Sequence, residues 1–256
     1  MRIGVIGLGV VGGAVHAYFP DSVGYDKYKP SSPFEDVVKT DVVFLCLPTL
    51  FDPALKQYDH VPIRETLQAL DRASYTGLVV LKSTVEPGTT RAFATEFPSL
   101  RLCHSPEFLC ARTAAEDFRS QRVLIVGKAT ETVDELLTLF PTVPTVVVCS
   151  SDESEATKLF VNSFYAAKIQ IFNEFYDVCQ KTSMDFSKIR DMMLTLGWIH
   201  PMHTMVPGSD GKLSFGGMCF PKDISACAEF LESNGALSRV LRAALTERNE
   251  MRADYL

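Results

Sequence analysis

The feature that most constrains the fold is a short apolar run at the N-terminus that leads directly into a glycine-rich turn. Residues 2–6 have the composition of a buried parallel strand. The turn reads Gly7-Leu8-Gly9-Val10-Val11-Gly12, and a helical pattern begins just after it. A G-x-G-x-x-G pattern means little alone, but a strand before it and a helix after it are the context of a dinucleotide-binding turn.

The positions of this turn suit contact with a pyrophosphate. Gly7 allows the tight turn, Gly9 lets the backbone approach the phosphates, and Gly12 lets helix and strand pack closely. The helix N-terminus, with Val10 and Val11 in its first turn, supplies open N–H groups and a partial positive charge. The alternative is a glycine-rich turn in some other α/β protein.

A second expected strand, at residues 22–25, ends in Asp26. This lies near the usual distance from the glycine turn for an acid that binds ribose. An acid accepts hydrogen bonds from a 2′-hydroxyl and repels a 2′-phosphate, so Asp26 favours NAD over NADP. Lys27 follows directly and weakens that preference somewhat.

Strand and helix patterns alternate through the first 150 residues. Apolar runs typical of strands occupy residues 41–47, 78–81, 100–103, 123–126 and 145–149, with helical patterns near 63–70, 89–97 and 131–140. The alternation predicts a Rossmann-type α/β domain over residues 1–150, with a doubly wound parallel sheet.

Ligands bind beyond the carboxyl ends of the strands in such sheets. Two segments at such ends contain hydroxyl groups, namely Pro48-Thr49 and the longer segment that includes Ser83 and Thr84. Both suit a loop that binds the ribose or nicotinamide of a cofactor. They suit ordinary caps and turns equally well.

From Ser151 onward the pattern is helical. Residues 151–181 form one long helical pattern, followed by shorter ones at 186–196, 221–233 and 236–253. We therefore expect an all-helical domain over residues 151–256 with a long central helix. Lys158 and Asn162 lie one turn apart on that helix, where a buried lysine and an amide can stabilise charge on a substrate oxygen. A solvated lysine fits the same spacing.

The segment Gly216-Gly217-Met218-Cys219-Phe220-Pro221-Lys222-Asp223 is the second distinctive motif. Two glycines leave room for a ligand beside the backbone, and the proline suits the first turn of a helix. Asp223 lies one helical turn beyond Cys219, so thiol and carboxylate can share a face. The motif suits a nucleophilic cysteine with a carboxylate nearby, but a tight loop around a buried cysteine is equally compatible with the segment alone.

Composition excludes several classes of protein. The chain has 256 residues, a net charge of −6 and a pI near 5.4, which argue against nucleic acid as a partner. We expect no membrane span, because no apolar stretch is long enough. The seven cysteines lack C-x-x-C spacing and predict reduced thiols in a cytoplasmic protein. His200 and His203 alone do not predict a metal site.

In combination, these motifs resemble the UDP-glucose and GDP-mannose 6-dehydrogenase family. The matching segments are residues 7–12, 83–90, 105–109, 158 and 162, 167–169, 173–174 and 215–223. Their order along the whole chain makes the resemblance specific. It implies that NAD oxidises the C6 primary alcohol of a nucleotide sugar, with UDP-glucose as the first candidate, to a carboxylate in two hydride transfers.

The resemblance also implies roles for particular residues. Cys219 traps the intermediate aldehyde as a thiohemiacetal, which gives up the second hydride and leaves a thioester for hydrolysis. The other expected catalytic groups are Lys158 and Asn162 on the substrate oxygen, Asp223 and Glu107 in proton transfer, and Thr84 near the nicotinamide and water. Substrate contacts are expected from Glu107, Phe108, Leu109, Lys158, Asn162, Phe215, Gly216 and Gly217.

Three departures separate the chain from the family pattern. Cys110-Ala111-Arg112 stands where a second glutamate followed by glycine is usual, and the loop at 197–215 lacks the usual arginine. Family members also continue into a further α/β domain that binds the nucleotide, whereas this sequence stops at Leu256. Either the sequence is part of a longer chain, or a partner subunit contributes, or the substrate is smaller or more loosely bound.

Two other functions remain open from the sequence. One is a two-electron dehydrogenase that resembles the β-hydroxyacid dehydrogenases, and the other is an NAD-binding regulator or inactive relic. We also expect a homodimer through the long helix, because Phe160, Phe164, Ile171 and Phe175 invite burial against a second copy. Packing of these residues on the closing helices of the same chain is the alternative.

Overall fold

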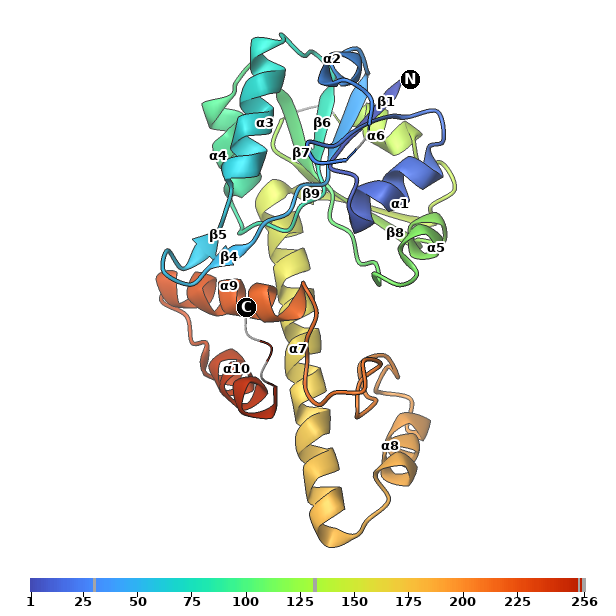
Figure 1. Cartoon of the computed structure of the whole chain (residues 1–256), viewed down its shortest axis with the longest axis vertical. Coiled ribbons are helices and arrows are strands. Elements are labelled where there is room, and N and C mark those ends of the chain that lie inside the picture. Colours follow the sequence, from blue (N-terminus) through green and yellow to red (C-terminus); the bar gives the residue numbers. More distant parts are fainter. Residues whose placement is uncertain (30, 131–132, 253, 255–256) are drawn as a thin grey trace. The chain divides into compact units, whose positions relative to one another are not determined.

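The computed structural model describes residues 1–29, 31–130, 133–252 and 254, and the chain divides into two compact units (Figure 1). The sheet unit comprises Met1–Asp52 and Tyr58–Lys158, and the helical unit comprises Pro53–Gln57 and Leu159–Leu256. Helix α7 (Ser151–Thr182) contributes its first turns to the sheet unit and the rest to the helical unit. The expected domain limits at residues 150 and 151 stay a prediction.

The sheet unit contains a seven-stranded sheet in the order β2-β1-β3-β6-β7-β8-β9. The strands are β1 (Ile3–Ile6), β2 (Val23–Tyr25), β3 (Val42–Leu45), β6 (Leu78–Leu81), β7 (Arg101–His104), β8 (Val123–Lys128) and β9 (Thr145–Ser150). The order reverses at β1, whose neighbours are β2 on one side and β3 on the other. This switch point is where such sheets bind ligands. The predicted Rossmann-type architecture is confirmed.

Helices cover both faces of the sheet, so its central strands are buried on both sides. Every residue of β1, β3 and β6 is buried, and alternate residues enter opposite cores. One core includes Val5 and Phe44 and is covered by α1 (Val10–Tyr18), α5 (Ala114–Arg119) and α6 (Asp134–Thr138). The other includes Val43 and Leu45 and is covered by α2 (Phe34–Val37), α3 (Val61–Arg72) and α4 (Thr89–Glu96).

The sheet is not parallel throughout. Strands β8 and β9 are parallel to each other, but β8 runs antiparallel to β7 and pairs with it only through Cys103–Lys128 and His104–Gly127. The six residues of α5 span about 9 Å at 1.5 Å per residue, too short to return the chain to the amino edge of the sheet. Strand β8 therefore starts from the carboxyl side. A small hairpin of β4 (Phe51–Asp52) and β5 (Gln57–Tyr58) was also not expected from the sequence.

The helical unit contains the rest of α7 with α8 (Phe186–Thr195), α9 (Phe220–Ser233) and α10 (Arg239–Met251). Ala166 of α7, Ile224 of α9 and Ala244 of α10 meet in one core, whereas Phe172 and Cys179 pack with Phe186 of α8 in another. The long central helix is confirmed. The expected helices at 131–140 and 236–253 extend onto residues 131 and 253, which lie outside the described residues.

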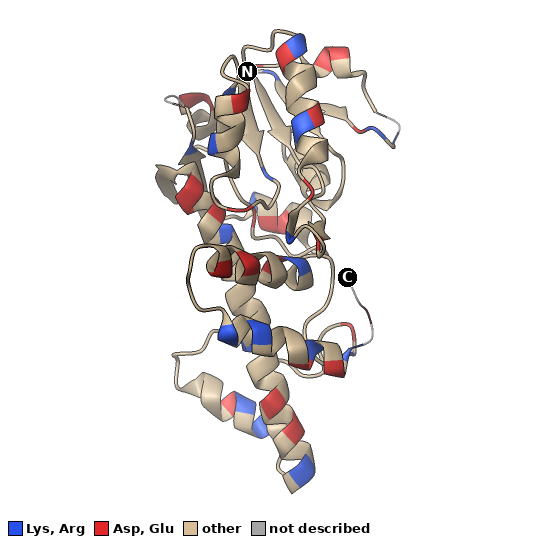
Figure 2. Cartoon of the chain, turned by 90° about the vertical axis from the view of Figure 1, so that its left-hand side faces the viewer, with Lys and Arg blue, Asp and Glu red and all other residues tan. Residues whose placement is uncertain are grey.

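None of the described helices combines the length and the apolar composition needed to cross a membrane. Figure 2 shows basic and acidic residues interspersed along the ribbon. In the helical unit, Arg242 of α10 pairs with Glu229 and Glu232 of α9 at 2.6 and 2.8 Å. These charges therefore stabilise the contact between two helices of the fold.

Candidate active site

The glycine turn between β1 and α1 has the geometry of a phosphate-binding loop. Gly7 has φ +88°, and a Cβ on it would lie 2.5 Å from the carbonyl oxygen of Cys46. A Cβ on Gly12 would collide with the carbonyl of Gly7. By contrast, a Cβ on Gly9 would meet no atom of the described residues within 4 Å. Packing therefore requires glycine at 7 and 12, whereas Gly9 leaves open space beside the backbone.

Helix α1 starts at Val10 with Gly9 as its N-cap, and no side chain of the described residues caps it. The N–H groups of the first helical turn, which include those of Val10 and Val11, have no partner within the helix. They are therefore available to an anion in the open space beside Gly9.

Asp26 at the end of β2 is held next to the glycine turn. Its Oδ2 accepts a hydrogen bond from the backbone N–H of Leu8 at 2.7 Å, and its Oδ1 accepts one from Tyr28 at 2.9 Å. Desolvation opposes ionisation, but these bonds and the nearby Lys29 lower the pKa of Asp26. The exposed ammonium of Lys27 lies 3.9 Å from Glu65. An ionised, oriented acid at this position fits the ribose of NAD.

Two of the hydroxyl groups expected near the cofactor form hydrogen bonds within the protein. Ser83 donates to the carbonyl of Leu47 at 2.7 Å and accepts from its N–H at 3.0 Å. Thr49 donates to the carbonyl of Thr84 at 2.6 Å. These bonds connect the loops after β3 and β6 and so fix both loops at the carboxyl edge. Pro48 is exposed. Contacts of a cofactor with Pro48, Thr49, Ser83 and Thr84 stay a prediction.

Lys158 and Glu107 form a buried ion pair in the sheet unit. The Lys158 ammonium donates to the Glu107 carbonyl at 2.6 Å and to its Oε1 at 3.0 Å, and lies 5.1 Å from the ring centroid of Phe108. The other carboxylate oxygen of Glu107 accepts from the N–H of Leu109 at 2.7 Å. Four residues predicted from the sequence to contact the substrate therefore lie together, namely Glu107, Phe108, Leu109 and Lys158.

Lys82 at the end of β6 supports the same loop and had no assigned role from the sequence. It is buried, and its ammonium donates to the carbonyl of Pro106 at 2.9 Å. Desolvation lowers the pKa of Lys82 to about 8. A lysine directly after a buried apolar strand was the available sequence signal.

Cys219 is exposed at the N-cap of α9, so the alternative of a buried cysteine is wrong. The N–H of Asp223 donates to the Cys219 carbonyl at 2.9 Å and closes the first turn of the helix. Asp223 itself is fully buried, and its carboxylate accepts from Asn162 at 2.6 Å and from Lys222 at 2.5 Å. Asn162 and Asp223 are therefore brought together as partners, with Lys222 as a third member that sequence reasoning missed.

The loop that precedes Cys219 is held by two buried arginines of the C-terminal part of the chain. Arg252 donates to the carbonyls of Leu213 and Ser214 at 3.2 and 3.3 Å, and Arg248 donates to that of Phe215 at 3.2 Å. A Cβ on Gly216 would collide with the Arg252 guanidinium. A side chain at 216 would thus displace this guanidinium from its hydrogen bonds, whereas Gly217, at φ +78°, has no described atom within 4 Å of such a Cβ.

Helix α7 holds the same loop from a second side. Asn173 accepts from the N–H of Ser214 at 2.8 Å, and Gln170 accepts from its hydroxyl at 2.6 Å. Phe215 is buried in the helical core. Neither the arginines nor Gln170 was singled out from the sequence, because their partners lie far away along the chain.

His203 packs between the rings of Tyr165 and Phe220, at centroid distances of 4.4 and 5.3 Å. Among the described residues, no group of three or more histidine, cysteine, aspartate or glutamate side chains is placed to hold a metal ion. The histidine therefore has a packing role beside the residue that follows Cys219.

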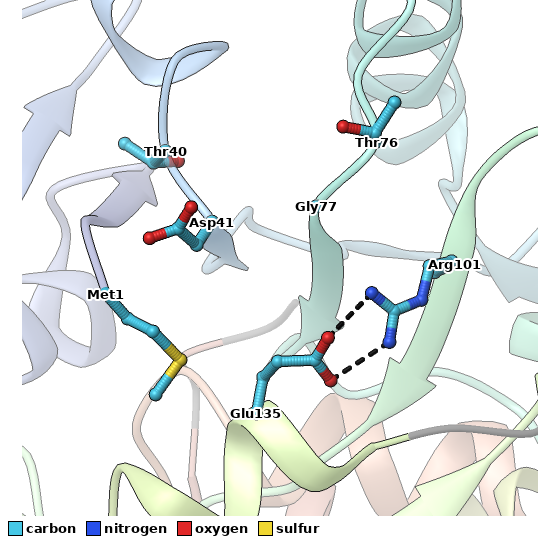
Figure 3. A pocket seen from close by; sticks show the side chains of 7 residues that line it. All are labelled: Met1, Thr40, Asp41, Thr76, Gly77, Arg101 and Glu135. Atoms are coloured by element: carbon cyan, nitrogen blue, oxygen red, sulfur yellow. Dashed lines mark hydrogen bonds and ion pairs between the residues drawn. The ribbon is translucent and has the colours of Figure 1, made fainter.

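A separate depression of about 400 Å³ lies at the amino edge of the sheet. Figure 3 shows Arg101 and Glu135 pointing toward each other across it, joined by hydrogen bonds of 2.7 and 2.9 Å. Met1, Thr40, Asp41, Thr76 and Gly77 complete its lining. Because Arg101 is paired and the glycine turn lies at the carboxyl edge, this depression is not part of the candidate active site.

The fold and the glycine turn define a Rossmann-fold dinucleotide-binding protein with a helical second unit. More particularly, the chain belongs to the UDP-glucose/GDP-mannose dehydrogenase family. Residues 20–143 match the NAD binding domain of that family and residues 152–250 match its central domain. The cofactor of this family domain is NAD.

The chain is similar to the UDP-glucose 6-dehydrogenase of Haloferax volcanii, at 28% identity over 86% of this chain and 55% of the relative. It thus spans about half the length of the curated relatives that it matches. The structure of a UDP-glucose dehydrogenase from Pyrobaculum islandicum matches with a TM-score of 0.85 at 27% identity, over 97% of this chain and 68% of that one. A 3-hydroxyisobutyrate dehydrogenase of Mycobacterium tuberculosis shares the fold at a TM-score of 0.74 and 18% identity, over 99% of this chain and 94% of that one.

Proposed function

We propose that this chain oxidises the C6 primary alcohol of a nucleotide sugar, with UDP-glucose as the first candidate substrate, to a carboxylate at the expense of two NAD⁺. One observation carries the proposal: Cys219 is exposed at the start of α9, one helical turn before a buried carboxylate that is bonded to Asn162. The family membership supports the same reaction.

The cofactor would be held by the turn from Gly7 to Gly12 and by Asp26. The open space beside Gly9 and the uncapped start of α1 suit a pyrophosphate, and the ionised Asp26 suits a ribose hydroxyl. When bound, NAD⁺ supplies the hydride acceptor for both oxidation steps. Pro48, Thr49, Ser83 and Thr84 belong to the neighbouring loops that would shape the rest of the site.

Cys219 is the nucleophile of this proposal. It stands at the N-cap of α9, the end of the helix that carries a partial positive charge. The sulfur attacks the aldehyde carbon, and the carbonyl oxygen takes up a proton to give a thiohemiacetal. Loss of a hydride and the hydroxyl proton leaves a thioester. Addition of water and cleavage of the carbon–sulfur bond then release the carboxylate and restore the thiolate.

The remaining groups stabilise charge and move protons. Lys158 and Asn162 lie one turn apart on α7 and are proposed to donate to the substrate oxygen as negative charge develops on it. Asp223 and Glu107 are the carboxylates proposed for the proton transfers of hydrolysis. Phe108, Leu109, Phe215, Gly216 and Gly217 are proposed to contact the substrate.

We further propose that the chain forms a homodimer through α7. Phe160, Phe164, Ile171 and Phe175 have exposed fractions of 45%, 63%, 45% and 38%. They are therefore not covered by the closing helices of the same chain. A second copy of α7 would cover them.

The test is the release of NADH from UDP-glucose, UDP-GlcNAc, UDP-mannose-type substrates and GDP-mannose. We expect two NADH per sugar oxidised, and no uronate from Cys219→Ala. Cys227→Ala, on the same helix, is the matched control and should retain turnover. One NADH per substrate would instead favour the β-hydroxyacid type of reaction. NAD binding without turnover of any substrate would favour the regulator or relic and overturn the proposal.

A further inference from the structure

A depression of about 480 Å³ lies beside the first turn of α1, within the sheet unit. Val10, Gly13 and Ala14 line it from α1, and residues 111–116 line it from the turn before α5 and the start of that helix. A Cβ on Gly13 would meet no described atom within 4 Å. The depression therefore opens beside the N-terminus of α1, next to the turn proposed to bind the phosphates of the dinucleotide.

Among the described residues that line this depression, Arg112 is the only basic one. Its side chain is exposed and forms no ion pair with a described carboxylate. Its polar neighbours include the Cys110 thiol, whose pKa is lowered by hydrogen bonds from the backbone and the side chain of Arg112. Glu116 also lines the depression, but no ion pair between Glu116 and Arg112 occurs in the described part of the chain. No described carboxylate neutralises the cation of Arg112, whereas Glu135 neutralises Arg101 at the other edge of the sheet.

The turn that carries Arg112 is fixed by hydrogen bonds. The N–H of Thr113 donates to the Cys110 carbonyl at 3.0 Å and closes the turn. Asp117 of α5 accepts from the N–H of Cys110 and from the hydroxyl of Thr113, both at 2.8 Å. Since α5 packs on α1, with the rings of Tyr18 and Phe118 5.3 Å apart, the turn has a fixed place beside the glycine turn.

We propose that Arg112 binds the pyrophosphate of NAD and adds a side-chain cation to the backbone N–H groups of α1. This inference rests on NAD binding by the glycine turn. A helix N-terminus offers about half a positive charge, whereas the pyrophosphate carries two negative charges. A guanidinium adds a full charge and can donate two parallel hydrogen bonds to phosphate oxygens.

The proposal also accounts for the departure from the family pattern at this turn. Where a glutamate and a glycine are usual, the chain has Ala111 and Arg112. A carboxylate at 111 would lie next to the guanidinium in sequence and compete with phosphate for it. The two changes together remove an anion and introduce a cation on the same side of the depression.

The experiment compares ligand binding by the full chain without turnover. Calorimetry measures the dissociation constants of NAD⁺ and ADP-ribose. NMR titration measures that of adenosine, which lacks phosphate. We expect Arg112→Met to weaken the binding of NAD⁺ and ADP-ribose by about tenfold or more, the usual effect of losing a charged hydrogen bond. The affinity for adenosine should stay unchanged. Arg112→Lys should be intermediate, because it keeps the charge but not the bidentate geometry. The salt dependence of NAD⁺ binding should be shallower in Arg112→Met.

The matched control is Arg119→Met, which removes an exposed arginine from the other end of α5. It should bind all three ligands like the wild type. NAD⁺ affinity of Arg112→Met within twofold of the wild type would overturn the proposal, as would an equal loss for adenosine, which would indicate a structural effect. Failure of the wild type itself to bind NAD⁺ would instead refute the cofactor assignment.

Discussion

The buried ion pair of Lys158 and Glu107 limits how many hydrogen bonds Lys158 can donate to a substrate. The Lys158 ammonium has three N–H donors and uses two of them on Glu107, one on the carbonyl and one on the carboxylate. One donor remains for a substrate oxygen. Glu107 in turn holds the ammonium in place, and the N–H of Leu109 orients its other oxygen. The pair therefore combines a structural role with the catalytic role that we propose for it.

Mutation of both members separates the effect on stability from the effect on activity. Lys158→Met should lower activity by about 100- to 1,000-fold, the usual effect of losing one donor to a developing oxyanion. It should also destabilise the chain by about 3–5 kcal/mol, because Glu107 loses its partner in a buried site. Adding Glu107→Gln should restore much of the stability, measured by urea unfolding, but none of the activity. Recovery of turnover in the double variant would limit Lys158 to a structural role.

The residues of the candidate site stand in motifs that the sequence shows, but most of their hydrogen-bond partners could not be predicted from it. Cys219, Asp223, Lys158 and Asn162 stand in short motifs whose spacing is visible along the chain. Arg252 holds the loop before Cys219 by a bond to Asp210, which is 42 residues away. Such long-range pairs depend on the packing of α10, and no local pattern indicates them.

The buried side chain of Glu155 joins the start of α7 to the start of α4. Glu155 accepts hydrogen bonds from the N–H groups of Gly88 and Thr90 at 2.6 and 2.7 Å and from the Thr90 hydroxyl at 2.5 Å. It caps α4 from another helix, since Gly88 has no side chain of its own. Burial nevertheless raises the pKa of Glu155 to about 7.

This shift predicts a dependence of stability on pH. The unfolded carboxyl ionises near 4.5 and the folded one near 7, so the folded state binds more protons between these values. The contribution of Glu155 to stability is therefore complete below pH 4.5 and is lost as pH rises through 7, by up to about 3 kcal/mol. The unfolding free energy of the wild type relative to Glu155→Gln should fall between pH 5 and 8. Glu65→Gln, an exposed glutamate on α3, is the control, and a constant difference would contradict the prediction.

The sheet illustrates which elements a sequence pattern can and cannot predict. Apolar runs and intervening helices indicated β1, β3, β6 and the glycine turn, because buried parallel strands have a local signature. The reversed direction of β8 and β9 has no such signature. It follows from the short α5, which leaves the chain at the carboxyl side of the sheet.

Helix α7 contributes residues to both units of the chain. Along its exposed side, Phe160, Phe164, Ile171, Phe175 and Val178 follow one another at spacings of three, four and seven residues. Such spacing produces an apolar stripe suited to a second helix. The stripe lies wholly within the helical unit, so its pairing does not depend on the sheet unit.

The dimer proposed from this stripe is tested by a charge at its most exposed member. Phe164→Glu should convert the protein from dimer to monomer in sedimentation velocity, because a second copy would place two carboxylates in an apolar contact. Val240→Glu introduces the same charge at an exposed valine of α10 and should leave the dimer intact. Circular dichroism distinguishes dissociation from unfolding, since α7 should remain helical in both variants. A wild type that sediments as a monomer at micromolar concentration would show that the stripe does not mediate self-association.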